Sequence, residues 1–518
     1  MDSALPPQLL AVLATLHREL EPERRQLLLA RTERQRAWDR GEVPGYLTGE
    51  VSELARGDWQ IAPLPADLRR RRVEITGPVD NAKMVIQMLS PNDEGVAADA
   101  AMLDFEDSMK PEWPRVLQGI TNVAGAARGD LFFETADAAG GTKRYELDPE
   151  TMPLVMVRCR GLHLAESNFP VDGQPISAGL FDLTTTAYHA AAALLDRGRT
   201  PKFYVPKCEH HLEARFWNRA FERIEEHLAL PPGCLRATLL IETLPAAFQM
   251  EEILWELRGR IAGLNVGRWD KIFSDIKTLR EHPDRVLADR ATIGMDRPWM
   301  HAYAEQLVRI CHRHGAFAMG GMAAFTPGKT PERRAEQRAK VLADKQFEAA
   351  LGHDGCWVSH PYFIGPALSA FHSDHQLAVV PAGSNRPDLL PRGGGPYTLA
   401  GLRKNVRVGI AYLEGWRRGL GCVAWDDLME DLATLEISRA QTWQWLRHAV
   451  VLDDGVPVTR ELVLRVFAEE ATRIEGELAS APAATRQAFA RAAEEASEIF
   501  TEPALRPFLA LASPIDRP

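Results

Sequence analysis

Two neighbouring runs of sequence decide the fold: Ala237-Thr-Leu-Leu-Ile-Glu-Thr243 and Leu264-Asn-Val-Gly-Arg-Trp-Asp270. Each run is a short apolar stretch that leads to one acidic residue, Glu242 in the first and Asp270 in the second. A buried strand that delivers a single carboxylate at its C-terminal end is how a (β/α)₈ barrel builds its active site. Two such carboxylates can share a hard divalent cation, typically Mg²⁺. The runs therefore predict a metal-dependent barrel enzyme; the simpler alternative is two strands that end in solvated acids.

Outward from these runs, short strand-like segments alternate with helical segments, which is typical of βα units and a parallel sheet. We expect eight strands, the number that a closed barrel needs. The predicted strands cover residues 101–107, 154–160, 202–206, 238–242, 261–267, 291–295, 316–320 and 355–360. The sequence thus predicts an α/β fold, a TIM barrel that spans residues 71–375.

The segments outside the barrel are predicted to be mainly helical. Residues 1–70 are expected to form an N-terminal helical element, with a second, charged helix over 26–40 whose charged face is solvated. A polar, Gly-rich stretch at about 126–150 predicts a small β insertion in the barrel. Residues 376–397 are rich in Pro and Gly, which favours a linker or loop. Residues 398–518 are predicted to be a C-terminal helical domain.

Composition narrows the class of protein. The chain has 518 residues, of which 45% are hydrophobic and 25% charged, a balance that is typical of a globular protein with two to three domains. A net charge of -10 leaves no excess of cations to neutralise phosphates, so we expect no nucleic-acid partner. No apolar run reaches the roughly 20 residues that cross a bilayer, so we expect no membrane partner. Scattered cysteines and the lack of a signal peptide predict a cytoplasmic protein with reduced thiols.

Charged residues follow several of the predicted strands. Because the strands of a barrel end at one mouth, we expect these side chains to converge there. Such a mouth suits an anionic substrate held between a metal ion and a guanidinium. At least one of the two arginines is expected to pair with an acid of the first group. In chain order the residues are Asp104, Glu106 and Asp107, then Arg158 and Arg160, then Lys207 and Glu209, then Glu242, then Asp270.

Glu430 and Asp431 precede an amphipathic helix in the C-terminal part of the chain. One interpretation is an acidic N-cap that complements the helix dipole. The other is a general base that the C-terminal domain brings to the barrel mouth. The pattern by itself leaves both open.

Eight motifs resemble those of the malate synthase family in its shorter A-type form. They occur in the order of the family pattern, and the resemblance runs from about residue 20 to 475. The motifs are Arg72-Val-Glu-Ile-Thr-Gly-Pro78, Asp104-Phe-Glu-Asp-Ser108, Val157-Arg-Cys-Arg-Gly-Leu-His-Leu164, Leu240-Ile-Glu-Thr-Leu-Pro245, Gly263-Leu-Asn-Val-Gly-Arg-Trp-Asp270, Ala318-Met-Gly-Gly-Met-Ala-Ala324, Gly352-His-Asp-Gly355 and Met429-Glu-Asp431.

The resemblance implies an acyltransferase of the glyoxylate cycle, which feeds the tricarboxylic acid cycle. The implied reaction is a Mg²⁺-dependent Claisen condensation of acetyl-CoA with glyoxylate, followed by hydrolysis of the thioester to malate and CoA. By the family pattern, Arg158 and Asp431 are catalytic, and Glu242 and Asp270 bind Mg²⁺. The implied substrate-binding residues are Gly267, Arg268, Trp269, Trp357 and Ser359. A monomer or a small homo-oligomer is expected.

Some positions depart from the family pattern, namely Ala424 and Trp425 before the catalytic aspartate and Tyr362 after His360-Pro361. They concern the CoA channel and the loops at the mouth. A related CoA-ester lyase of the malyl-CoA type, on the same barrel, is the alternative enzyme. The helical domain that carries Met429-Glu-Asp431 favours the synthase. A barrel that only binds ligands is the alternative outside enzymes, and the presence of all four predicted catalytic and metal-binding residues opposes it.

Overall fold

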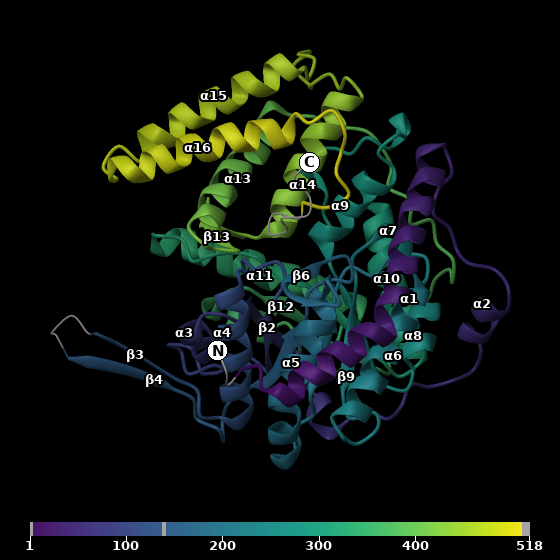
Figure 1. Ribbon diagram of the computed structural model, residues 1–518. Helices are drawn as coiled ribbons and strands as arrows, with labels where there is room; N and C mark the ends of the chain where they lie inside the picture. The colour runs from purple at the N-terminus through teal and green to yellow at the C-terminus, as the bar shows by residue number, and fades with distance from the viewer. Residues whose placement is uncertain (1–3, 137–140, 510–518) are drawn as a thin grey trace.

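Eight parallel strands close into a barrel in the computed structural model, which describes residues 4–136 and 141–509 (Figure 1). The predicted TIM barrel is therefore confirmed. The strands run around the barrel in chain order, and the last pairs with the first through Cys356 and Val73. They are β1 (Val73–Pro78), β2 (Ala100–Asp104), β5 (Leu154–Arg158), β8 (Lys202–Val205), β9 (Arg236–Ile241), β10 (Ile261–Val266), β11 (Phe317–Ala323) and β12 (Gly355–Val358).

One of the eight predicted strands is wrong. Residues 291–295 contain the end of a short 3₁₀ helix, η3 (Arg290–Thr292), and the apolar Ile293 of this segment packs against the C-terminal helices. The missing strand is β1, which pairs with β2 and β12. Its sequence carries Glu74 and Thr76 among apolar residues, so it does not have the continuous apolar pattern of a buried strand. Both side chains are nonetheless buried, because polar partners meet Glu74 inside the barrel.

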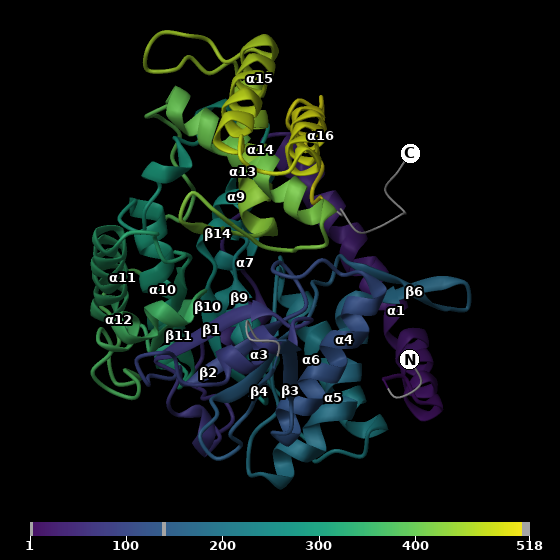
Figure 2. The same ribbon diagram turned by 90° about the vertical axis from the view of Figure 1, so that its left-hand side faces the viewer.

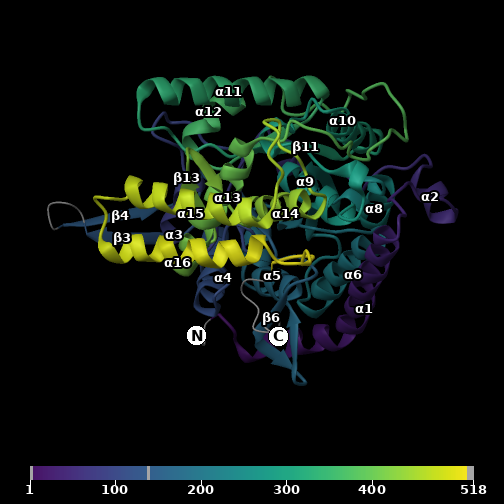
Figure 3. The same ribbon diagram turned by 90° about the horizontal axis from the view of Figure 1, so that it is seen from above.

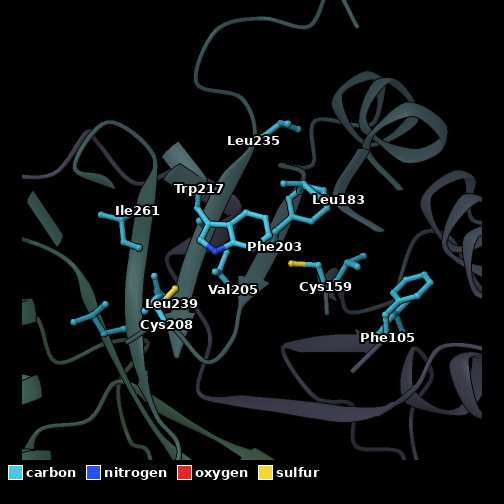
Figure 4. Packing of buried hydrophobic residues seen from close by; sticks show 14 of the residues in the cluster. Phe105, Cys159, Leu183, Phe203, Val205, Cys208, Trp217, Leu235, Leu239 and Ile261 are labelled. Carbon is cyan, nitrogen blue, oxygen red and sulfur yellow. The ribbon is translucent and has the colours of Figure 1, made fainter. Parts of the chain in front are cut away.

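Helices surround the barrel and pack on the outer faces of its strands. Figure 4 shows Trp217 of α6 beside Phe203 and Val205 of β8, and all three belong to the main core. A Cβ on Gly179 of α5 would lie 2.7 Å from the Trp217 ring, so this glycine lets the two helices approach. The barrel helices are α3 (Ala82–Met88), α4 (Trp113–Arg128), α5 (Ala178–Asp196), α6 (His211–His227), α7 (Leu244–Ala247), α8 (Met250–Leu257), α9 (Arg268–Thr278), α10 (Pro298–Arg313), α11 (Pro331–Leu351) and α12 (Ile364–Leu368).

The N-terminal segment begins with one long helix rather than two. Helix α1 (Pro7–Asp39) continues through Pro22 and absorbs the separate helix that was predicted for residues 26–40. It packs against α5 and α6, at the right of Figure 1. The prediction that the charged face of residues 26–40 is solvated is wrong for Arg31, which is buried against Glu213 and the carbonyl of Lys207. A short helix, α2 (Glu50–Ala55), and the 3₁₀ helix η1 (Ala66–Leu68) follow.

Two antiparallel hairpins interrupt the barrel units. Strands β3 (Phe132–Ala136) and β4 (Thr142–Glu146) form an exposed hairpin that projects away from the body in Figure 1. Strands β6 (Ala165–Val171) and β7 (Gln174–Ser177) form the second, after β5. Neither hairpin contributes a strand to the barrel.

The C-terminal helices stack on one end of the barrel (Figure 2). Helix α14 packs against α9, and the two share an apolar cluster that includes Ile276 and Ile437. Seen from above in Figure 3, α15 and α16 lie side by side. These elements are α13 (Leu399–Arg417), β13 (Val423–Trp425), β14 (Leu428–Glu430), α14 (Leu432–Arg447), α15 (Arg460–Glu477) and α16 (Ala483–Phe500). Within the described ranges, no helix combines the length and apolar character that a membrane crossing requires.

Candidate active site

A cavity of about 810 Å³, counting space that is open to solvent, lies where the strand ends of the barrel meet the C-terminal hairpin β13–β14. The structure brings every predicted site residue to this one cavity. Its walls include Arg158, Glu242, Gly267, Arg268, Trp269, Asp270, Trp357, Ser359 and Asp431.

Arg158, the last residue of β5, is held by a carboxylate of the neighbouring strand. Its Nε and Nη2 atoms donate to the two oxygens of Asp104 at 2.7 and 2.6 Å. Its Nη1 atom lies 3.5 Å from Glu106 and 3.7 Å from Asp107. Burial opposes the charge of Arg158, but Asp104, Glu106 and Asp107 together outweigh burial and raise the pKa of Arg158. The expected pairing of an arginine with this acidic group is thus confirmed, and the guanidinium is a fixed cation at the cavity.

Arg160 takes a different place. It donates to both oxygens of Asp182 and to Glu166, all of them buried. Its charge is therefore fully used within the barrel wall, and it does not line the cavity.

Glu242 and Asp270 approach each other because of a glycine. Glu242 follows β9, and Asp270 lies in the first turn of α9, directly after β10. Gly267 is the N-cap of α9, and a Cβ there would lie 2.5 Å from the Cβ of Glu242 and 2.8 Å from its Oε2. Gly267 has no side chain that could cap this helix end, and its own N–H donates to the Tyr303 hydroxyl at 3.2 Å. The backbone N–H groups of this helix end are thus suited to receive a carboxylate.

Lys207, after β8, joins the acids of three other strands. Its Nζ lies 2.6 Å from Asp107, 3.0 Å from Glu106 and 3.5 Å from Asp270. Its backbone N–H donates to Oε1 of Glu242 at 2.7 Å. Although burial opposes its charge, these acids raise the pKa of Lys207.

The site carries more negative than positive charge. Several buried oxygens have no hydrogen-bond partner within the described residues: both of Glu106, Oδ1 of Asp107 and Oδ1 of Asp270. Burial raises the pKa of Glu106, Glu242 and Asp270, and neighbouring acids add to the effect. Such groups are stabilised when a cation binds. Three basic side chains, those of Arg158, Lys207 and Arg268, stand against six carboxylates at the site. The carboxylates are Asp104, Glu106, Asp107, Glu242, Asp270 and Asp431.

This donor set fits Mg²⁺. The described residues contain no group of three or more His, Cys, Asp or Glu side chains in metal-binding geometry. Mg²⁺ commonly uses only one or two protein carboxylates and completes its shell with water and substrate. Glu242 and Asp270, which face one cavity from adjacent strand ends, meet that requirement.

Asp431 reaches the cavity from the C-terminal domain. The β13–β14 hairpin that carries it is attached to the end of β11, where Met429 N–H donates to Ala324 O at 2.8 Å. Asp431 caps α14 by accepting from Thr434 N–H at 3.2 Å. Burial, followed by the charge of Asp107, raises its pKa to about 7. The predicted cap is therefore present, and the same side chain lines the cavity.

Aromatic residues form part of the wall. Trp357 donates from Nε1 to Glu74 at 3.0 Å, and its ring lies 5.8 Å from the guanidinium carbon of Arg158. The Trp269 ring lies 4.4 Å from the guanidinium of Arg268 and 5.6 Å from that of Arg290. Ser359, beyond β12, donates to the carbonyl of Ala323 at 3.3 Å.

The unusual positions in the sequence lie away from this wall. Trp425 packs on Phe489 of α16 with Arg407 at 5.3 Å, and Tyr362 packs on Phe363. Neither residue, nor Ala424, lines the cavity. These departures therefore leave the described cavity wall unchanged.

Part of the cavity wall comes from residues that were not predicted. Thr76, Gly77, Pro78 and Met84 line the cavity from β1 and the start of α3. They were missed because β1 was not recognised as a strand. The sequence did carry a signal for β1, because Val73–Pro78 is a short segment just before the Asp104 strand, in line with the spacing of the other strands.

Comparison with known proteins follows the same division of the chain. The family models for the malate synthase N-terminal domain, TIM barrel domain and C-terminal region match residues 3–50, 154–383 and 397–514. The chain is 44% identical to malate synthase A of Escherichia coli (strain K12), over 88% of this chain and 85% of that protein. It is 46% identical to a malate synthase of Myxococcus xanthus (strain DK1622), over 91% of this chain and 86% of that protein. It is 42% identical to a malate synthase of Oryza sativa subsp. japonica, over 97% of this chain and 90% of that protein.

Proposed function

The chain belongs to the malate synthase family, whose enzymes condense acetyl-CoA with glyoxylate. We propose the following roles for its residues in that reaction. The observation that carries the proposal is the convergence of Arg158, Glu242, Asp270 and Asp431 on one cavity. Three of these residues come from barrel strand ends, and the fourth comes from another domain.

Glyoxylate binds beside the N-terminus of α9 in this proposal. The N–H groups of residues 267–270 receive its carboxylate, which the N-terminus of a helix favours. Glu242 and Asp270 hold Mg²⁺, which when bound supplies a Lewis acid for the aldehyde oxygen. Gly267 keeps this wall close to Glu242, because any side chain would displace that carboxylate.

Asp431 is the proposed general base. Its carboxylate takes a proton from the methyl group of acetyl-CoA, and the C–H electron pair forms the enolate. A base works best when its pKa lies near the working pH, and burial raises the pKa of Asp431 to about 7. The thioester methyl group is a very weak acid, so the position of the base matters as much as its strength.

Arg158 stabilises the charge that develops on oxygen. Asp104 fixes two of its nitrogen atoms, so the guanidinium needs no reorganisation during the reaction. The enolate carbon then attacks the aldehyde carbon and forms the new C–C bond, while the π electrons of the aldehyde move onto its oxygen, which takes a proton from water to become the hydroxyl of malyl-CoA. Water finally adds to the thioester carbonyl, and CoA leaves as its thiol.

The family match over residues 397–514 supports the synthase over the malyl-CoA lyase alternative, because this region carries Asp431. We further propose a cytoplasmic location and a monomer or small homo-oligomer.

The test is release of free CoA thiol from acetyl-CoA and glyoxylate, with and without Mg²⁺. We expect release only when glyoxylate and Mg²⁺ are both present. Asp431→Asn should lower the rate by about 10²-fold or more, the usual effect of losing a general base. Accumulation of malyl-CoA without free thiol would instead identify the lyase. A wild-type rate of CoA release in this variant would show that Asp431 is not the general base.

A further inference from the structure

Lys207 has an unusual backbone. Its φ angle of 53° lies in the left-handed region, where residues other than glycine are uncommon. Such a conformation persists only where the surroundings hold it, and it is frequent at functional sites. The residue directly follows β8, and it is buried at 4% exposure.

The two peptide groups of Lys207 are each anchored by a charged side chain. On one side, its N–H donates to Oε1 of Glu242 at 2.7 Å. On the other side, its carbonyl accepts from Nη2 of Arg31 in α1 at 2.8 Å. These bonds fix both planes that flank its Cα, and so they hold φ and ψ in the left-handed region.

Arg31 is itself held rigidly. Its Nε and Nη2 atoms donate to the two oxygens of Glu213 in α6, at 2.8 and 2.6 Å. Glu213 also accepts from Glu209 N–H at 2.8 Å, which ties it to the same loop as Lys207. A planar guanidinium can bond a carboxylate and a carbonyl at once, which an ammonium cannot do with the same geometry.

We infer that Lys207 is the positioning residue for the carboxylates of Glu242 and Asp270, and that Arg31 of α1 holds it in place. The left-handed turn presents the backbone N–H to Glu242, and the ammonium group, which donates to Asp107 at 2.6 Å, lies 3.5 Å from Oδ1 of Asp270 as an ion pair. One residue thus contacts both proposed metal ligands from two directions. The N-terminal helix lies outside the barrel, yet its Arg31 reaches the loop after β8 through the Lys207 carbonyl and, by way of Glu213, through the Glu209 N–H.

This inference rests on the proposed function, since it concerns the proposed Mg²⁺ ligands. Groups that orient metal ligands typically change metal affinity by about 10–100-fold when they are removed. The predicted effect can therefore be measured by binding alone, without turnover.

The experiment is calorimetric titration of the whole protein with Mg²⁺ alone. The variant Arg31→Met removes the bond to Lys207. The matched control is Arg24→Met, on the same helix. Arg24 is also buried, pairs with Glu21 and donates to two loop carbonyls, those of Leu162 and Leu164, but has no bond to Lys207. Each variant removes one of two arginines from a buried acid, since Glu213 keeps Arg34 and Glu21 keeps Arg25, so both are expected to lose thermal stability.

We expect Arg31→Met to weaken Mg²⁺ binding by about tenfold or more, while Arg24→Met stays within about twofold of the wild type. Arg31→Lys, which keeps the charge opposite Glu213, serves if the methionine variant does not fold, and its affinity should also fall. Wild-type affinity in a folded Arg31 variant, or equal losses in both positions, would overturn the inference. Absence of Mg²⁺ binding to the wild type would instead contradict the metal ligands of the proposed function.

Discussion

At the scale of single residues, Asp431 combines a structural and a chemical position. It caps α14 through Thr434, and it lines the cavity opposite Arg158. Sequence patterns presented cap and base as competing interpretations. They are compatible because one oxygen satisfies the helix end while the carboxylate still faces the cavity. The cap fixes the side chain, which a general base requires.

The raised pKa of Asp431 predicts a pH-dependent difference in stability. The folded protein holds this proton up to a pH of about 7, whereas the unfolded chain releases it near the usual value of 3.8. The contribution of Asp431 to stability is therefore full below pH 3.8 and is lost as the pH rises through about 7. Asp431→Asn removes this dependence, and asparagine still caps a helix.

We therefore expect Asp431→Asn to melt several degrees above the wild type at pH 8, with a difference that shrinks toward pH 5. Scanning calorimetry across that pH range measures it. A variant that melts below the wild type at pH 8 would show that Asp431 is not destabilised by burial.

Gly267 predicts a steric effect on the metal ligands. Gly267→Ala places a Cβ 2.5 Å from that of Glu242, so the carboxylate must move. We expect weaker Mg²⁺ binding and loss of CoA release. The matched control is Gly259→Ala, where a Cβ meets nothing within 4 Å. Thiol release and calorimetry measure both variants, and an active Gly267→Ala enzyme would contradict the proposed role.

At the scale of elements, α14 must be docked on α9 for the site to form. The N-cap of α9 is the glycine beside Glu242, and the N-cap of α14 is Asp431. Their shared cluster, which includes Ile276 and Ile437, is thus the apolar link between the two halves of the proposed site. Loss of packing there changes the distance between base and metal ligands.

Ile437→Ala tests this link. Truncation of a buried isoleucine typically costs about 2–5 kcal/mol, and the side chain is fully buried. We expect a lower melting temperature together with a reduced rate of CoA release at a temperature where the protein is folded. Ile224→Ala, in the core on α6, is the control: it should lose similar stability and keep its rate. Equal rates of CoA release in the two variants would show that the packing of α14 on α9 does not affect catalysis.

At the scale of the whole molecule, the barrel and the C-terminal domain line the same cavity, and α1 contacts the loop after β8 through Arg31 and Lys207. The barrel supplies an excess of carboxylates, α1 holds Lys207, and the C-terminal domain supplies Asp431. A molecule assembled in this way gains stability when a cation neutralises part of that charge. Ligands that bind only the folded state raise its stability in proportion to the logarithm of their concentration.

Saturating Mg²⁺ is therefore expected to raise the melting temperature relative to protein in a chelator. At about 100 times its dissociation constant, a bound ligand adds about 2.7 kcal/mol. Glu242→Gln and Asp270→Asn should reduce this rise, because each removes a proposed ligand. A melting temperature that does not respond to Mg²⁺ in the wild type would contradict the metal site.

The sequence by itself determined the class of fold and the identity of the candidate site residues. Apolar runs that lead to polar residues predicted seven of the eight barrel strands. A buried parallel strand is apolar, and the functional residues of a barrel follow the ends of its strands. The same local logic placed Glu242, Asp270 and Arg158 at the mouth, and family motifs added Asp431. The three-dimensional cavity then brought all of these positions together.

Only the tertiary structure decided how polar residues become buried. Strand β1 was missed because Glu74 is polar, and its burial depends on Arg71 and Tyr204, which no local pattern links to it. Residues 291–295 were mistaken for a strand because an apolar run has the same composition whether it packs in a barrel or, like Ile293, against helices. The contact of Arg31 with Lys207 joins positions 176 residues apart, and such partners are set by packing rather than by local sequence.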